Sequence, residues 1–212
     1  PEVALNLLKD GNKRFVNNLR ESRNLLQQVN ETCQNQFPFA AVLSCIDSRT
    51  SAELIFDQGL GDIFSIRIAG NVLNQDILGC MEFACSIAGS KVIVVLGHTN
   101  CGAVVGACND LKLGNFTPLI EKIKPSVRKV EQSNDNLKEL DQQRFVVEVA
   151  IDNVKRTVEL IRKQSTILQK LECDGKIMIV GGLYSLQTGE VQFFDQPAST
   201  GTKETTCCCQ GG

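Results

Sequence analysis

The chain has 212 residues, of which 42% are apolar, and its 22 lysines and arginines nearly balance 24 aspartates and glutamates, for a formal charge of −2. A chain of this length can bury one full core, so a single domain is expected. The mixed charges provide no broad basic field for phosphate backbones, which argues against nucleic acid as a partner. The longest apolar run, residues 92–97, is far shorter than the ~20 residues of a membrane span, so no span is expected.

Ten cysteines are the unusual feature of the composition. A small secreted protein would use them for disulfides, but a chain of this size does not need such cross-links, which favours thiol or metal chemistry. The first residue is Pro1, and no signal-peptide pattern follows it. We favour a cytoplasmic location; export or a periplasmic location, through a leader removed before Pro1, stays open.

The N-terminal half of the sequence predicts helices that alternate with short buried strands. Apolar residues recur at helical spacing in residues 1–19, which predicts an amphipathic helix. A polar stretch rich in Asn and Gln, residues 24–36, separates this helix from the first strand. The following elements are strands at 39–44, 62–68 and 91–96, with helices at 51–57 and 76–88 between them.

The C-terminal half predicts mostly helix, followed by a hairpin. The expected helical stretches are residues 102–108, 117–132 and 137–169, with a polar break at 133–135. A fourth strand at 176–180 is followed by a turn at 187–190 and a last strand at 191–194.

The alternation of strands and helices predicts an α/β fold. We expect a mainly parallel four-stranded sheet with a C-terminal antiparallel hairpin strand and helices on both faces. One domain would span residues 1–195, with an N-terminal helical arm at about 1–36. The tail, residues 196–212, contains Cys207–Cys209 and should be poorly ordered. Because a polar linker separates the first helix from the sheet, we expect its apolar stripe to pack on a neighbouring subunit.

Two predicted parallel strands lead directly into metal-ligating residue types. Cys45 follows the first strand, and His98 and Cys101 follow the third. The carboxyl ends of parallel strands meet at one edge of a sheet, where ligand sites gather. Two thiolates and one imidazole suit a tetrahedral zinc ion, and three protein ligands leave a fourth position open, as in catalytic zinc sites.

The motifs at these strand ends resemble the paired signatures of the β-class carbonic anhydrases. They are Cys45-Ile-Asp-Ser-Arg49 and Gly97-His-Thr-Asn-Cys-Gly102. The resemblance extends over roughly residues 4–194 and includes Phe56-Asp-Gln-Gly59, Asp62-Ile-Phe64 and Arg67-Ile-Ala-Gly-Asn71. It implies a zinc lyase that hydrates CO2 reversibly to bicarbonate and a proton through zinc-bound hydroxide.

The resemblance also implies a role for each matching residue. Cys45, His98 and Cys101 would bind one Zn²⁺ per subunit. Asp47 would accept a hydrogen bond from the hydroxide, while Arg49 keeps that carboxylate ionised and away from the metal. The matching substrate-binding positions are Gln36, Phe64, Ala69 and Gly102. In some members the aspartate takes the fourth zinc position at low pH, and whether Asp47 does so stays open.

The same resemblance implies a homodimer at minimum, with dimers that pair into tetramers and a pocket at the dimer interface. Two alternatives stay open: a hydrolase of carbonyl sulfide or carbon disulfide on the same scaffold, and a non-catalytic zinc-binding or thiol-binding protein. His98 is the only histidine of the chain. With His98 assigned to zinc, we expect protons to leave through water and external buffer.

Overall fold

A five-stranded sheet forms the centre of the protein, in a computed structural model that describes residues 1–133 and 137–194. The strand order is β2-β1-β3-β4-β5, with β4 and β5 antiparallel and all other neighbours parallel. This confirms the predicted parallel sheet with a C-terminal hairpin. The strands are β1 (Ala40–Ser44), β2 (Ile63–Arg67), β3 (Val92–His98), β4 (Met178–Tyr184) and β5 (Val191–Phe193).

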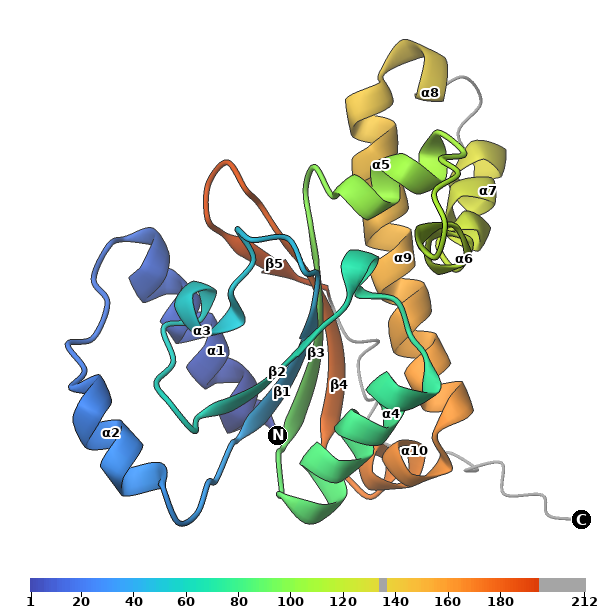
Figure 1. Ribbon diagram of the computed structural model, residues 1–212. Coiled ribbons are helices and arrows are strands. Elements are labelled where there is room, and N and C mark those ends of the chain that lie inside the picture. The colour runs from blue at the N-terminus through green and yellow to red at the C-terminus, as the bar shows by residue number, and fades with distance from the viewer. Residues whose placement is uncertain (134–136, 195–212) are drawn as a thin grey trace, which may run out of the picture.

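Helices cover both faces of this sheet (Figure 1). One face carries α1 (Glu2–Val16) and α3 (Ala52–Ile55), and α2 (Leu25–Thr32) lies farther from the sheet on the same side. The other face carries α4 (Gln75–Glu82), α9 (Gln142–Gln164) and α10 (Thr166–Cys173). Around one end of α9 lie four short helices, α5 (Gly102–Cys108), α6 (Phe116–Ile120), α7 (Lys124–Ser133) and α8 (Leu137–Leu140). None of the described helices is both long and apolar enough to cross a bilayer.

The two central strands are buried along their whole length, because helices cover the sheet on both sides. Their side chains alternate between the faces. Ala41 and Leu43 of β1 pack with the α4 and α9 side, whereas Ala40 and Val42 pack with the α1 and α3 side. The sheet therefore separates two apolar cores, and its central strands are held firmly where they approach the site.

Two glycines let α9 lie close to the sheet. A Cβ at Gly97 would lie 2.5 Å from Val154 Cγ2, and one at Gly181 would lie 2.8 Å from Val154 Cγ1. Strand β4 continues to Tyr184, four residues beyond the predicted end. Glycine has weak strand propensity, so the pair Gly181-Gly182 concealed the continuation.

The first helix packs on its own chain, which corrects the expectation that its apolar stripe rests on a neighbouring subunit. Ala4 and Leu8 are buried against β1, β3 and α3. Asn12 Nδ2 donates to the carbonyls of Ile55 (3.1 Å) and Gly189 (2.9 Å). The physical reason is that this face of the sheet needs an apolar cover, and the linker is long enough for α1 to fold back onto it.

The helix boundaries differ from the sequence prediction at several places. The polar stretch contains α2, which begins after the N-cap residue Asn24. This helix buries none of its residues, so no apolar pattern in the sequence predicted it. The helix predicted at 76–88 is α4 followed by a π-helical turn, η2 (Phe83–Ile87). The long helical stretches are interrupted, since Asp141 and Ser165 each cap a new helix with their side chains. Residues 134–135 of the predicted break, and the predicted tail 196–212, lie outside the described residues.

Candidate metal centre

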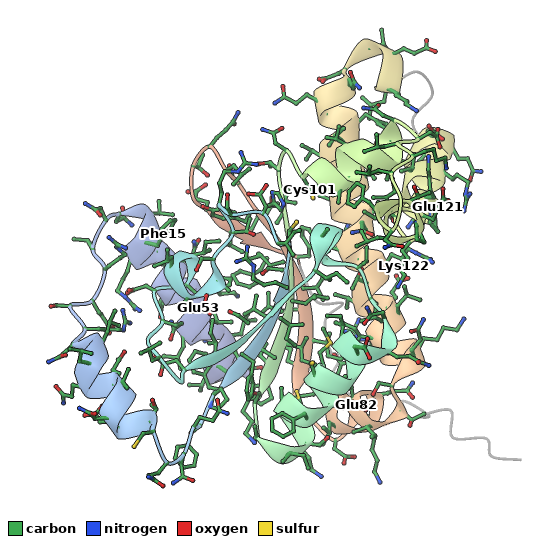
Figure 2. All side chains as sticks on the ribbon, in the orientation of Figure 1. Phe15, Glu53, Glu82, Cys101, Glu121 and Lys122 are labelled. Atoms are coloured by element: carbon green, nitrogen blue, oxygen red, sulfur yellow. The ribbon has the colours of Figure 1, made fainter. Side chains whose placement is uncertain are left out.

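Three potential metal ligands converge at the carboxyl edge of the sheet. Cys45 follows β1, His98 ends β3, and Cys101 is the N-cap residue of α5, as Figure 2 shows for the labelled Cys101. All three are buried, and one ligand atom from each lies within 4.8 Å of the others. The two sulfur atoms are 3.9 Å apart. Two sulfurs on one tetrahedral zinc ion, each at about 2.3 Å from it, would be ~3.8 Å apart, so the spacing fits such an ion.

The imidazole of His98 is held in the orientation that a metal ligand requires. Its Nδ1 lies 2.8 Å from the carbonyl oxygen of Thr99, so Nδ1 carries the proton and donates it. Its Nε2 is buried and has no hydrogen-bond partner among the described residues. Thr99 is itself fixed, since its N–H donates to the Tyr184 carbonyl (3.0 Å) and its hydroxyl accepts from Leu186 N–H (3.0 Å). A buried lone pair without a donor fits a metal ion.

The Cys45 and Cys101 side chains are hydrogen-bonded to each other through their sulfur atoms. The Cys101 thiol donates to Cys45 and, with a smaller contribution from the Gly70 N–H at 3.3 Å, lowers the pKa of Cys45 against the effect of burial. The same hydrogen bond, together with burial, raises the pKa of Cys101. A divalent cation can replace the proton of this hydrogen bond and stabilise both sulfurs as thiolates.

Asp47 and Arg49 form a bidentate ion pair next to the ligands. Arg49 Nε donates to Asp47 Oδ1 (2.9 Å), and Nη2 donates to Oδ2 (2.7 Å). The backbone N–H of Arg49 also donates to Oδ1 (3.0 Å). The Arg49 guanidinium holds the pKa of the Asp47 carboxyl well below its usual range. The carboxylate is therefore ionised at neutral pH.

A second arginine fixes the loop that carries this pair. Arg67, at the end of β2, donates from Nε to the Cys45 carbonyl (3.0 Å) and from Nη2 to the Asp47 carbonyl (2.6 Å). The hydroxyl of Thr50 donates to the same two carbonyls, at 3.1 and 2.9 Å. Sequence reasoning assigned no role at the metal site to Arg67 or Thr50, although Arg67 opens one of the motifs that resemble the family.

The four predicted substrate-binding residues are not all near these ligands. Ala69 is buried in the apolar cluster that contains Cys45 and Cys101, and Gly102 is exposed at the start of α5. Gln36 is exposed and precedes β1, at the opposite end of that strand from Cys45. Phe64 pairs in register with Ala41, four residues before Cys45, and its ring contacts Phe83 edge to face at 6.1 Å between centroids. Gln36 and Phe64 therefore lie away from the metal ligands of their own chain.

Comparisons with known proteins agree with this geometry. A family model described as carbonic anhydrase matches residues 40–191. Carbonic anhydrase 2 of Mycobacterium tuberculosis is 36% identical over 209 residues, which cover 95% of this chain and 96% of that protein. Among solved structures, the β-carbonic anhydrase CafA of Aspergillus fumigatus superposes with a TM-score of 0.73 at 24% identity, over 80% of this chain and 81% of that chain.

A tetrameric β-carbonic anhydrase from Sordaria macrospora shares the fold with a TM-score of 0.68 at 20% identity, over 79% of this chain and 89% of that chain. The relative from M. tuberculosis matches this chain over nearly its full length, and the family model covers both ligand motifs. These matches show that the chain is an enzyme of the carbonic anhydrase family and that it has the fold of the β-carbonic anhydrases.

Proposed function

We propose that this enzyme hydrates CO2 reversibly to bicarbonate and a proton with one zinc ion per chain, bound by Cys45, His98 and Cys101. The observation that carries the proposal is the buried Nε2 of His98, which has no partner among the described residues and lies beside two sulfurs that are 3.9 Å apart. Zinc bound there would supply a water molecule acidified to a pKa of ~7.

The ion pair of Asp47 and Arg49 would supply the hydrogen-bond acceptor that orients the attacking water. The ionised Asp47 can accept a hydrogen bond from the attacking water and so orient its lone pair toward CO2. Arg49 occupies both oxygens of that carboxylate, which keeps the carboxylate at a distance from the metal. Ala69, buried in the same apolar cluster as Cys45 and Cys101, would supply an apolar wall that suits a substrate without charge.

We further propose a homodimer at minimum, with a site completed by the second copy. If Gln36 and Phe64 contact substrate, the neighbouring subunit must supply them, because both lie away from the ligands of their own chain. The relative from S. macrospora is tetrameric, which supports assembly of this fold into oligomers.

Stopped-flow measurement of CO2 hydration on protein of known zinc content tests the proposal. Cys45→Ser should lose zinc and activity together. Asp47→Asn should keep zinc but lose rate by about 100-fold or more, which is the usual contribution of a positioned proton acceptor. Asp10→Asn removes an exposed pair with Lys13 and is the matched control, with both properties unchanged. Full activity of zinc-free wild-type protein would refute the proposal.

A second assay addresses the alternative substrates. Release of hydrogen sulfide from carbonyl sulfide or carbon disulfide is measured on the same preparation. We expect CO2 hydration to dominate, since two relatives that are 36% identical to this chain are carbonic anhydrases. Sulfide release at a rate that exceeds CO2 hydration would overturn the substrate assignment and leave the zinc site intact.

A further inference from the structure

A hydrogen bond joins α9 to η1 (Ala69–Asn71), the short turn whose backbone contacts Cys45. Asn153, in the middle of α9, is 2% exposed, and its Nδ2 donates to the Gly70 carbonyl at 2.9 Å. The Gly70 N–H donates in turn to Cys45 Sγ at 3.3 Å. The side chain of Asn153 is thus connected to a metal-ligating sulfur through one residue of backbone.

Gly70 has a backbone conformation that needs external support. Its φ is +65°, in the left-handed region that side chains disfavour. A Cβ at this position would lie 2.7 Å from Ile123 Cδ1 and 3.1 Å from Ala103 Cβ, so only glycine fits. Glycine is also the most flexible residue, and its N–H points at Cys45 only while the peptide groups on both sides of its Cα stay fixed.

Asn153 is one of three polar residues that α9 buries, the others being Asp152 and Thr157. The remaining buried positions near it are apolar, namely Val149, Ala150, Val154 and Val158. A buried side-chain amide is unfavourable unless it is hydrogen-bonded. Its contact with the Gly70 carbonyl provides the reason for an amide at this place.

We propose that Asn153 is a positioning residue of the metal centre: it holds Gly70 so that the Gly70 N–H stays on Cys45 Sγ. This inference rests on the zinc site proposed above. A hydrogen bond to a metal-bound thiolate fixes the direction of the sulfur and withdraws electron density from it. Loss of Asn153 should therefore weaken metal binding and make the sulfur a stronger electron donor.

Two measurements on Asn153→Leu test the inference. Replacement of residues that orient metal ligands typically weakens metal affinity 10–100-fold, so the zinc dissociation constant, measured by competition with a chromophoric chelator, should rise at least ~10-fold. In cobalt-substituted protein, the sulfur-to-cobalt absorption band should move to longer wavelength, because the sulfur holds its electrons less tightly. A general loss of stability would not shift this band.

A control variant, Thr157→Val, and a second Asn153 variant, Asn153→Ser, both lie in α9. Thr157→Val, one turn further along α9, also removes a buried polar group and should leave affinity and band unchanged. Asn153→Ser is small enough to fold and too short to reach Gly70, so it should behave like Asn153→Leu. Wild-type affinity and an unshifted band in both Asn153 variants would overturn the inference while the zinc site stands. A wild-type protein that binds neither zinc nor cobalt would overturn the zinc site and this inference together.

Discussion

Arg67 connects the two chemical functions of the site. Its guanidinium contacts the carbonyl of the ligand Cys45 and the carbonyl of Asp47, so one rigid planar group sets the distance between them. A lysine in its place carries the same charge on a single nitrogen and cannot reproduce two directed contacts. The position of the Asp47 carboxylate therefore depends on the shape of this side chain as well as on its charge.

Arg67→Lys is expected to keep zinc and to lower kcat/KM for CO2 hydration by about 10-fold, because loss of one charge-assisted hydrogen bond is worth ~1.5 kcal/mol or more. Arg128→Lys, an exposed position on α7, is the matched control and should keep full activity. Stopped-flow rates and zinc content are measured on both variants. An Arg67→Lys enzyme with wild-type kcat/KM would contradict this role.

Residue types reveal a site when its chemistry lies in the side chains themselves. The grouping of Cys45, His98 and Cys101 could be predicted because two thiols and an imidazole at the ends of two parallel strands form a set that suits a metal ion. Arg67 and Asn153 act on backbone carbonyls, which every residue possesses. No spacing rule singles out the side chain that a given carbonyl will meet, so the position of Asn153 behind Gly70 had to come from the packing of α9.

At the scale of elements, one buried carboxylate joins the N-terminal arm to α3. Asp57, whose side chain is 3% exposed, accepts from Arg14 Nε and Arg23 Nη1, both at 2.6 Å. The Glu21 N–H also donates to it, at 3.2 Å. Burial alone would raise the pKa of Asp57, but these donors outweigh burial and lower it.

Asp57→Asn should lower the free energy of unfolding by about 2 kcal/mol at pH 7, since two arginines lose their carboxylate partner. Asparagine tolerates the φ of +47° at this position, so the backbone is unaffected. Because the pKa of Asp57 is lower in the folded protein, its stabilisation is fully present above the unfolded value of ~3.9 and is lost as pH falls through the folded value.

Urea unfolding at pH 7 and at pH 3 measures this effect. The difference between wild type and Asp57→Asn should shrink at the lower pH. Asp10→Asn removes an exposed ion pair and should cost less than ~0.5 kcal/mol at either pH. A difference for Asp57→Asn that persists unchanged at pH 3 would show that the carboxylate charge is not its source.

The close approach of α9 to the sheet gives a second prediction for the elements. Gly97→Ala should destabilise the protein by about 2 kcal/mol, because the new Cβ would overlap Val154. Val154→Ala alone should cost ~2 kcal/mol through a cavity. The double variant should cost clearly less than the sum, since each change relieves the other. Additive losses in denaturant unfolding would rule out this contact as the reason for Gly97.

Helices and strands could be predicted where apolar residues recur along a buried face, and they were missed where the sequence has no such pattern. The central strands are continuous apolar runs, and their place was predictable for that reason. The α2 helix contributes no buried residue, and the Gly181-Gly182 part of β4 has no side chain to reveal its burial. The apolar stripe of α1 predicted a buried face but could not identify the surface that covers it.

At the scale of the whole molecule, the separation of Gln36 and Phe64 from the ligands of their own chain predicts shared sites. Cys45→Ser and the double variant Gln36→Ala/Phe64→Ala should each be nearly inactive. Co-refolding equal amounts should recover about a quarter of wild-type activity, because half of the dimers are hybrids and each hybrid has one intact site. Activity equal to the average of the two parents would exclude sites shared between subunits.

The route by which the proton released in CO2 hydration leaves the enzyme depends on the composition of the whole chain. Hydration of CO2 releases one proton per turnover, and histidine is the side chain that most readily shuttles protons at neutral pH. The chain has His98 alone, and its Nδ1 is engaged by Thr99 while its Nε2 faces the metal ligands. We therefore expect kcat to rise several-fold with the concentration of a buffer of pKa near 7, while kcat/KM stays constant. Stopped-flow rates are measured in dilute and in concentrated imidazole. A kcat that does not change with buffer concentration would indicate a proton relay through the protein and contradict direct transfer to buffer.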